Sequence, residues 1–253
     1  MRPGNRWPAN LSTLANGLVG VGAIAYVLAG NKLWAMMLIV SGIGFDGLDG
    51  WLSRRAGLGP SKFGRIADSV ADAVTFGLAP AALLIVHTDQ AGLWQPWNGW
   101  TELAGATVAA LALGRLAWFT VRSFRETDFV GVPTPQNALA LVALLLWLDV
   151  PGFAGIAPEA VAIGAIGLAV LMVVPIRFPK IRRGSALRYP MTGTGVAFVV
   201  ALLPLQFRPA PGTVLDEIGL AGTAVATVGV AAYYLLGPFT VHGPPGAPEG
   251  EVR

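Results

Sequence analysis

The fold of this 253-residue chain is decided by the stretch from residue 46 to residue 72, which reads DGLDGWLSRRAGLGPSKFGRIADSVAD. It joins two apolar segments, residues 33–53 and 65–87, and places acidic residues inside both of them. Each segment has the length of the roughly 20 residues that an α-helix needs to cross a bilayer. Ionisable residues within such helices are costly and mark functional sites. The stretch therefore predicts two membrane-spanning helices that carry a site between them.

The rest of the chain has the composition of a membrane protein. It is 54% hydrophobic and only 12% charged, whereas soluble domains carry about 25% charged residues. This excludes a soluble enzyme, a disordered chain and a coiled coil. We expect an all-α, polytopic bundle with eight spans, at about residues 12–29, 33–53, 65–87, 103–121, 136–149, 158–176, 191–206 and 217–237. The fifth run is short and the seventh contains Pro204, so either one is alternatively a re-entrant segment.

Basic residues are distributed unevenly between alternate loops. Of the 17 Lys and Arg residues, 14 lie in the two termini and in the loops on the same side, whereas the opposite loops hold only Lys32 and Arg208. The remaining one, Arg115, lies within a span. Because cytoplasmic loops are enriched in Lys and Arg, we expect a multi-pass protein of the cytoplasmic membrane with both termini in the cytoplasm.

Four acidic residues within the spans form two pairs. Asp46 and Asp49 are three residues apart and Asp68 and Asp72 are four apart, so each pair lies on one face of its helix. A carboxylate at membrane depth costs about 2.5 to 3.5 kcal/mol and needs compensation. The two helices run antiparallel across a short basic loop, so the pairs converge on the cytoplasmic side. Four oxygen-ligand residues suit Mg²⁺ or Mn²⁺, as one ion or two, and salt bridges to nearby arginines are the alternative.

Three neighbouring residues suit a bound pyrophosphate. Gly50 and Gly64 lack a side chain, which allows a bulky ligand to approach the backbone. Arg54 lies one turn beyond Gly50 and carries a fork of donors suited to phosphate oxygens. Helix packing is the alternative explanation for the two glycines.

Together these residues resemble the signature of the CDP-alcohol phosphotransferases, in which two Asp, Gly and Ala-Arg are followed by a spacer, Gly and two further Asp. Here Ser53 stands where Ala is usual, and the spacer is one residue longer. The resemblance implies a six-helix membrane core, to which this chain adds two C-terminal spans, and usually a homodimer. We expect residues 1–241 to form a single transmembrane catalytic domain. Residues 242–253 are rich in Pro and Gly and are expected to form a short flexible cytoplasmic tail.

The resemblance also implies an active site open to the cytoplasm, where two divalent ions bind the CDP moiety and an acceptor hydroxyl displaces CMP. By position, the metal ligands are Asp46, Asp49, Asp68 and Asp72. Asp72 is also the candidate catalytic base, although a carboxylate bound to metal is a weak base. The residues expected to contact the CDP moiety are Gly50, Arg54, Gly64, Asn10 and Thr13.

Several of these assignments have an alternative. Asn10 and Thr13, together with Asn16, either contact the nucleotide or cap the first helix. Arg115 either contacts the acceptor or its phosphate, or pairs with one of the acids. Arg182 belongs to a basic cluster that either grips phosphate or follows from the orientation of the chain.

Segments outside the signature resemble the phosphatidylserine synthase branch of the family, at residues 13–20, 68–81, 129–135 and 171–178. This implies an enzyme of phospholipid biosynthesis that converts CDP-diacylglycerol and L-serine into phosphatidylserine and CMP at the membrane lipid surface. Trp118 and Thr120 replace a basic residue and an amide that are common in bacterial members, so inositol phosphate and glycerol phosphate are alternative acceptors.

A cation or proton transporter is the alternative from a different class, because acids within a membrane also line ion paths. We disfavour it, since no other predicted span carries an acid at depth. We expect no nucleic-acid partner.

Overall fold

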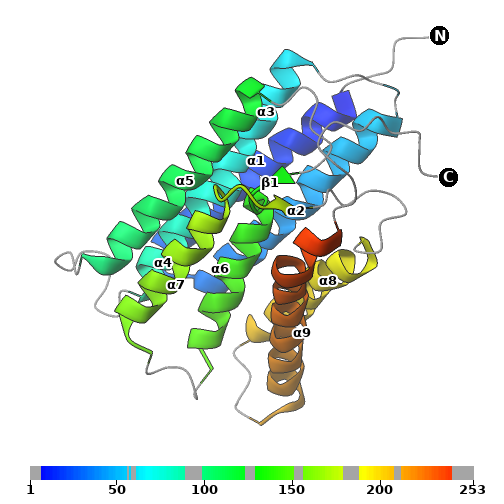
Figure 1. The fold of residues 1–253 in the computed structure, drawn as a ribbon. Helices are drawn as coiled ribbons and strands as arrows, with labels where there is room; N and C mark the ends of the chain where they lie inside the picture. The colour runs from blue at the N-terminus through cyan, green and yellow to red at the C-terminus, as the bar shows by residue number, and fades with distance from the viewer. Residues whose placement is uncertain are drawn as a thin grey trace.

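The computed structural model describes residues 7–55, 57, 61–88, 99–122, 129–150, 156–178, 188–207 and 212–240. Within these ranges eight helical segments run back and forth, in agreement with the eight apolar runs of the sequence (Figure 1). They are α1 (Trp7–Leu28), α2 (Lys32–Arg55), α3 (Lys62–Asp72) continued by the π-helix η1 (Ala73–Leu78) and α4 (Ala79–Thr88), α5 (Trp100–Arg122), α6 (Thr134–Leu148), α7 (Pro158–Leu171), α8 (Arg188–Leu205) and α9 (Val214–Leu236). The expected tail, residues 242–253, lies outside the described residues.

Five of these helical segments are long and apolar enough to cross a membrane, namely α1, α2, the continuous α3–η1–α4 helix, α5 and α9. The shorter apolar helices include α6, which corresponds to the short fifth run. Its side chains are buried around most of the helix, and it contacts α2, α4, α5, α7 and α9. A helix that is apolar on all sides belongs in the interior of a bundle. The fifth run is therefore a central helix of the fold.

Helix α1 packs closely against both α2 and the α3–η1 segment. A Cβ atom on Gly20 of α1 would lie 2.8 Å from the Cα of Thr75 in η1, and one on Gly42 of α2 would overlap the Thr75 methyl group. The Thr75 hydroxyl donates a hydrogen bond to the backbone carbonyl of Asn16, at 2.7 Å. Small residues allow helices to approach this closely inside a membrane. The three helices are thereby held together beside the acidic residues.

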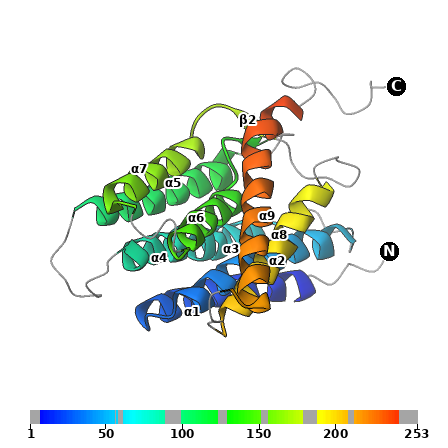
Figure 2. The same ribbon diagram turned by 90° about the horizontal axis from the view of Figure 1, so that it is seen from below.

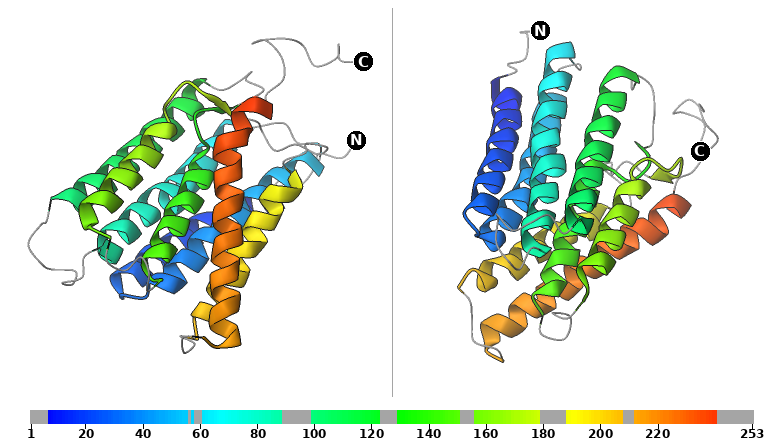
Figure 3. Two further views of the ribbon diagram at one scale, coloured as in Figure 1. Left: turned by 60° about the horizontal axis from the view of Figure 1, so that its bottom comes forward. Right: turned by 90° about the vertical axis from the view of Figure 1, so that its left-hand side faces the viewer.

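The two C-terminal helices, α8 and α9, lie side by side along one flank of the bundle and are inclined to α1, α3 and α5 (Figures 2 and 3). Glycine again makes the close contact, because a Cβ atom on Gly222 of α9 would lie 2.8 Å from the backbone nitrogen of Ala201 in α8. Helix α8 contacts α2, and α9 contacts α6. The pair is therefore attached to the core through the second and the sixth helix.

A short two-stranded ribbon lies between these parts. Strand β1 (Phe129–Val130) pairs antiparallel with β2 (Arg177–Phe178). Gly131 follows β1 with a φ of 72° and donates its N–H to the carbonyl of Ile176, at 2.8 Å. A Cβ atom at this position would overlap the carbonyl group of Met172. Gly131 therefore needs both the left-handed backbone and the absence of a side chain.

We expect Gly131→Ala to lower the midpoint of thermal unfolding in detergent, because the added Cβ carries a left-handed backbone penalty of about 1 to 2 kcal/mol and also overlaps Met172. Gly30→Ala is the matched control: its φ is 74°, and nothing lies within 4 Å of the added Cβ. Gly30→Ala should lower the unfolding midpoint only by the amount that the backbone penalty causes. Equal midpoints for the two variants would contradict the close contact between Gly131 and Met172.

Candidate functional site

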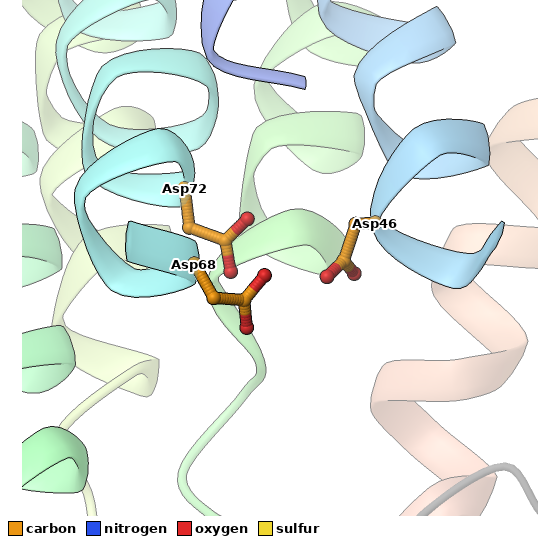
Figure 4. A group of neighbouring side chains, drawn as sticks. All are labelled: Asp46, Asp68 and Asp72. Carbon is orange, nitrogen blue, oxygen red and sulfur yellow. The ribbon is translucent and has the colours of Figure 1, made fainter. Parts of the chain in front are cut away.

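Three of the four predicted acids converge between two neighbouring helices. Asp46 comes from α2, and Asp68 and Asp72 come from successive turns of α3. One carboxylate oxygen from each lies within 4.8 Å of the other two. Figure 4 shows the three side chains pointing toward one another from the two helices. The convergence that the spacing of the acids predicts is present in the fold for these three residues.

The fourth acid, Asp49, lies beside this group and is held from the other side. Its Oδ2 accepts a hydrogen bond from the hydroxyl of Thr13 on α1, at 2.7 Å. Its carboxyl group also lies close enough to that of Asp68 for electrostatic repulsion. A cation between two carboxylates relieves such repulsion. Asp49 is thus adjacent to the three converging acids, with its other oxygen left for a further ligand.

The arrangement fits a divalent metal ion. Asp68 Oδ1 is buried and has no hydrogen-bond partner among the described residues. A buried charged oxygen without a partner is costly, and Mg²⁺ and related hard cations take oxygen ligands from carboxylates. Asp46, Asp68 and Asp72 are therefore residues that can hold such an ion, as the sequence predicts.

A buried amide fixes the orientation of Asp72. The side-chain N–H of Asn16 on α1 donates to Asp72 Oδ1, at 2.8 Å. Asn16 is completely buried, and its position is secured by the Thr75 hydroxyl bond to its backbone carbonyl. This leaves Asp72 Oδ2 as the oxygen available for a ligand or a proton. Asn16 thus orients a side chain of the site, Asp72, by this hydrogen bond.

Sequence reasoning did not assign this role to Asn16, although a signal for it exists. Ser12, Asn16 and Gly20 recur every four residues on an otherwise apolar helix, and all three are buried. Such a recurrence is typical of a face that packs against other helices. Asn10, which was predicted together with Thr13, is exposed on the surface of α1.

The structure describes the surroundings of only some of the residues predicted to contact the CDP moiety or its phosphates. Gly64 lies in the first turn of α3, where its N–H donates to the Ser61 hydroxyl at 2.9 Å. A Cβ atom on Gly64 would lie 2.8 Å from that oxygen, so part of the need for glycine is local capping. Gly50 is half-buried next to Asp49. Arg54 is in the last turn of α2, but its side chain lies outside the described part of the structure, as does the whole of Arg182.

Arg115 on α5 is buried in the interior of the bundle, where its side chain is only 7% exposed. One guanidinium nitrogen donates to the Thr134 hydroxyl at 3.0 Å, and the guanidinium lies over the ring of Phe119 at 4.6 Å. It also lies close enough to Asp72 for electrostatic attraction. The side chain of Arg115 therefore lies inside the bundle, within electrostatic range of Asp72.

The two residues of α5 that differ from the bacterial pattern, Trp118 and Thr120, have different surroundings from Arg115. Trp118 is 57% exposed on the surface of the helix. The Thr120 hydroxyl lies 2.5 Å from that of Ser69, which follows Asp68 on α3. Thr120 therefore ties α5 to the helix that carries the acids.

We expect Mn²⁺ or Mg²⁺ to raise the midpoint of thermal unfolding, since an ion present at 100 times its Kd stabilises a protein by about 2.7 kcal/mol. Asp68→Asn should lose this shift. Without metal it should unfold at or above the wild-type midpoint, because one of several repelling carboxylates is removed.

Glu159→Gln, at the exposed start of α7, is the control and should keep the full shift. A metal-dependent shift that survives in Asp68→Asn would place the ion elsewhere.

Comparison with known proteins identifies the family of the chain. Residues 6–174 match the family described as CDP-alcohol phosphatidyltransferase. A CDP-diacylglycerol–serine O-phosphatidyltransferase of Bacillus subtilis is 32% identical over 177 residues, which cover 69% of this chain and 90% of the relative. One from Helicobacter pylori is 32% identical over 182 residues, covering 69% and 72%. The archaetidylserine synthase of Methanothermobacter thermautotrophicus is 27% identical over 173 residues, covering 68% and 69%. The matched region contains all four acids, and the chain belongs to the CDP-alcohol phosphatidyltransferase family.

Proposed function

We propose that this chain is a CDP-diacylglycerol–serine O-phosphatidyltransferase, which makes phosphatidylserine and CMP. The observation that carries the proposal is the convergence of Asp46, Asp68 and Asp72 within the region that matches the family. The choice of serine is supported by relatives from two bacteria that bear this name and align with most of their length.

In the proposed reaction, the serine hydroxyl oxygen attacks the phosphorus that carries the diacylglycerol. A new P–O bond forms, the bond from this phosphorus to the bridging oxygen breaks, and CMP leaves with that oxygen. Asp72 Oδ2 accepts the proton of the hydroxyl, while Asn16 holds Oδ1 and so fixes the direction of the carboxylate. Oriented groups of this kind supply much of the rate of phosphoryl transfer.

Asp46, Asp49, Asp68 and Asp72 would hold two divalent ions, Mg²⁺ or Mn²⁺. When bound, the ions neutralise the pyrophosphate and stabilise the charge of the departing CMP. Within the protein, Thr13 secures Asp49 and Asn16 secures Asp72, so two polar side chains of α1 orient the ligands. We assign contacts with the CDP moiety to Gly50, Arg54, Gly64, Asn10 and Thr13, with Arg182 as a further phosphate contact.

Arg115 is proposed to bind the carboxylate of the acceptor. It is the cation buried deepest among the described side chains, and it lies within electrostatic range of Asp72, the proposed base. A guanidinium fork matches the two oxygens of a carboxylate. The same fork accepts a phosphate, which is why the acceptor has to be tested directly.

We further propose that residues 1–241 form one catalytic domain in the cytoplasmic membrane, working as a homodimer among the membrane lipids. The strong excess of Lys and Arg on one side of the helices supports an orientation with both termini and the acids toward the cytoplasm.

We expect purified protein in detergent, supplied with CDP-diacylglycerol and Mn²⁺ or Mg²⁺, to release CMP with L-serine but not with myo-inositol 1-phosphate or sn-glycerol 3-phosphate. Asp72→Asn should lower the rate by about 100-fold or more, as expected when a general base is removed. Glu159→Gln should keep the wild-type rate. Release only with one of the phosphorylated acceptors would retain the family and overturn serine as the substrate.

The orientation can be tested by labelling, because the chain contains no Cys. Asn31 is in the exposed turn between α1 and α2, and Lys62 is the exposed first residue of α3, at the opposite end of the helices. In intact cells a membrane-impermeant maleimide should label Asn31→Cys, and it should label Lys62→Cys only after the membrane is opened. The reverse pattern would place the acids outside the cell.

A further inference from the structure

The last helix of the chain reaches the buried arginine next to the acids. Helix α9 lies beyond residue 174, where the family match ends. Near its C-terminal end Tyr233 is only 2% exposed, and its side chain is close enough to Arg115 for electrostatic interaction. A segment outside the matched region thus places a buried polar side chain within electrostatic range of a residue of the proposed site.

The ring of Tyr233 is held rigidly. It stacks on Phe178 of strand β2, with ring centroids 5.6 Å apart and an angle of 25° between the planes. Val132, which follows the other strand, is completely buried in the same cluster. Because the ring is fixed by the ribbon, the hydroxyl has a defined position. A tyrosine hydroxyl can accept a hydrogen bond from a guanidinium, which has donors only.

The next residue, Tyr234, contacts the first turns of α6, where Thr134 accepts the hydrogen bond from Arg115. Its hydroxyl makes a long contact of 3.5 Å with Asn137 Oδ1. Asn137 lies one turn after Thr134, the residue that accepts from Arg115, so both face the same side of α6. The Asn137 side-chain nitrogen is buried and has no hydrogen-bond partner among the described residues. A buried donor of this kind calls for an acceptor, here next to the Arg115 guanidinium.

We propose that α9 positions the two donors that bind the anionic group of the acceptor, Tyr233 acting on Arg115 and Tyr234 on Asn137. The acceptor class is a small alcohol that carries a carboxylate or phosphate. Tyr233 and Tyr234 are positioning residues, since neither touches the reacting atoms. This assignment rests on the proposed function, because it concerns the acceptor side of the same site.

The test is Tyr233→Phe, which keeps the ring on Phe178 and removes only the hydroxyl. We expect the KM for L-serine to rise about tenfold, which corresponds to about 1.4 kcal/mol of binding free energy. The KM for CDP-diacylglycerol and the unfolding midpoint should be unchanged. Tyr26→Phe is the matched control, because Tyr26 stacks on Trp34 at the far end of the bundle. It should leave both KM values unchanged.

A double-mutant cycle separates action through Arg115 from a general effect on the fold. If Tyr233 acts through Arg115, its hydroxyl should matter little once Arg115 is replaced. In an Arg115→Lys background, adding Tyr233→Phe should therefore change the KM for L-serine by less than about twofold, which is the usual scatter of additivity in such cycles. A full additional tenfold rise would overturn the proposal, as would an equal rise in both KM values.

The outcomes also separate this proposal from the proposed function. If the wild type uses a phosphorylated acceptor in place of serine, the cycle is measured with that acceptor. If the wild type releases no CMP with any of the three acceptors, both proposals are overturned. A working wild type with an unchanged KM in Tyr233→Phe overturns only the positioning role.

Discussion

Charge buried in an apolar environment must be compensated, and the carboxylates between α1, α2 and α3 impose this requirement on the helices around them. Helix α1 supplies two neutral donors, the hydroxyl of Thr13 to Asp49 and the amide of Asn16 to Asp72. Helix α5 brings the guanidinium of Arg115 near Asp72. Asp68 retains an oxygen with no partner in the described part of the chain. The compensation provided by the protein is therefore partial, and it leaves negative charge at the place where a cation can be held.

Donors of this kind work only if the helices approach closely and in one register. Gly20 and Gly42 provide the space, and Thr75 occupies it with a hydroxyl bonded to the carbonyl of Asn16. Thr75 lies within the π-helical segment that follows Asp72. Such segments are frequent at functional sites, because the extra residue in the turn shifts the faces of the helix that continues from it. The packing that stabilises the bundle and the orientation of Asp72 thus depend on the same few atoms.

The proposed acceptor side of the site depends on a longer chain of contacts. Gly131 allows the ribbon to close against the end of α7, and the ribbon carries Phe178. Phe178 in turn stacks on the ring of Tyr233, which lies within electrostatic range of Arg115. The two C-terminal helices therefore connect to the interior of the core as well as to its flank.

The sequence by itself determined the class of fold, the approximate positions of eight helices and the four acids, because apolar run length and i, i+3 or i, i+4 spacing are local properties of the chain. Tertiary structure alone decided which groups meet. Asn16 and Asp72 are 56 residues apart in sequence, and no local pattern pairs them. Arg115 and Tyr233 are likewise brought together only by the packing of α5, the ribbon and α9. Charge burial could be foreseen from the sequence, but the donors that compensate it depend on helix register and close approach.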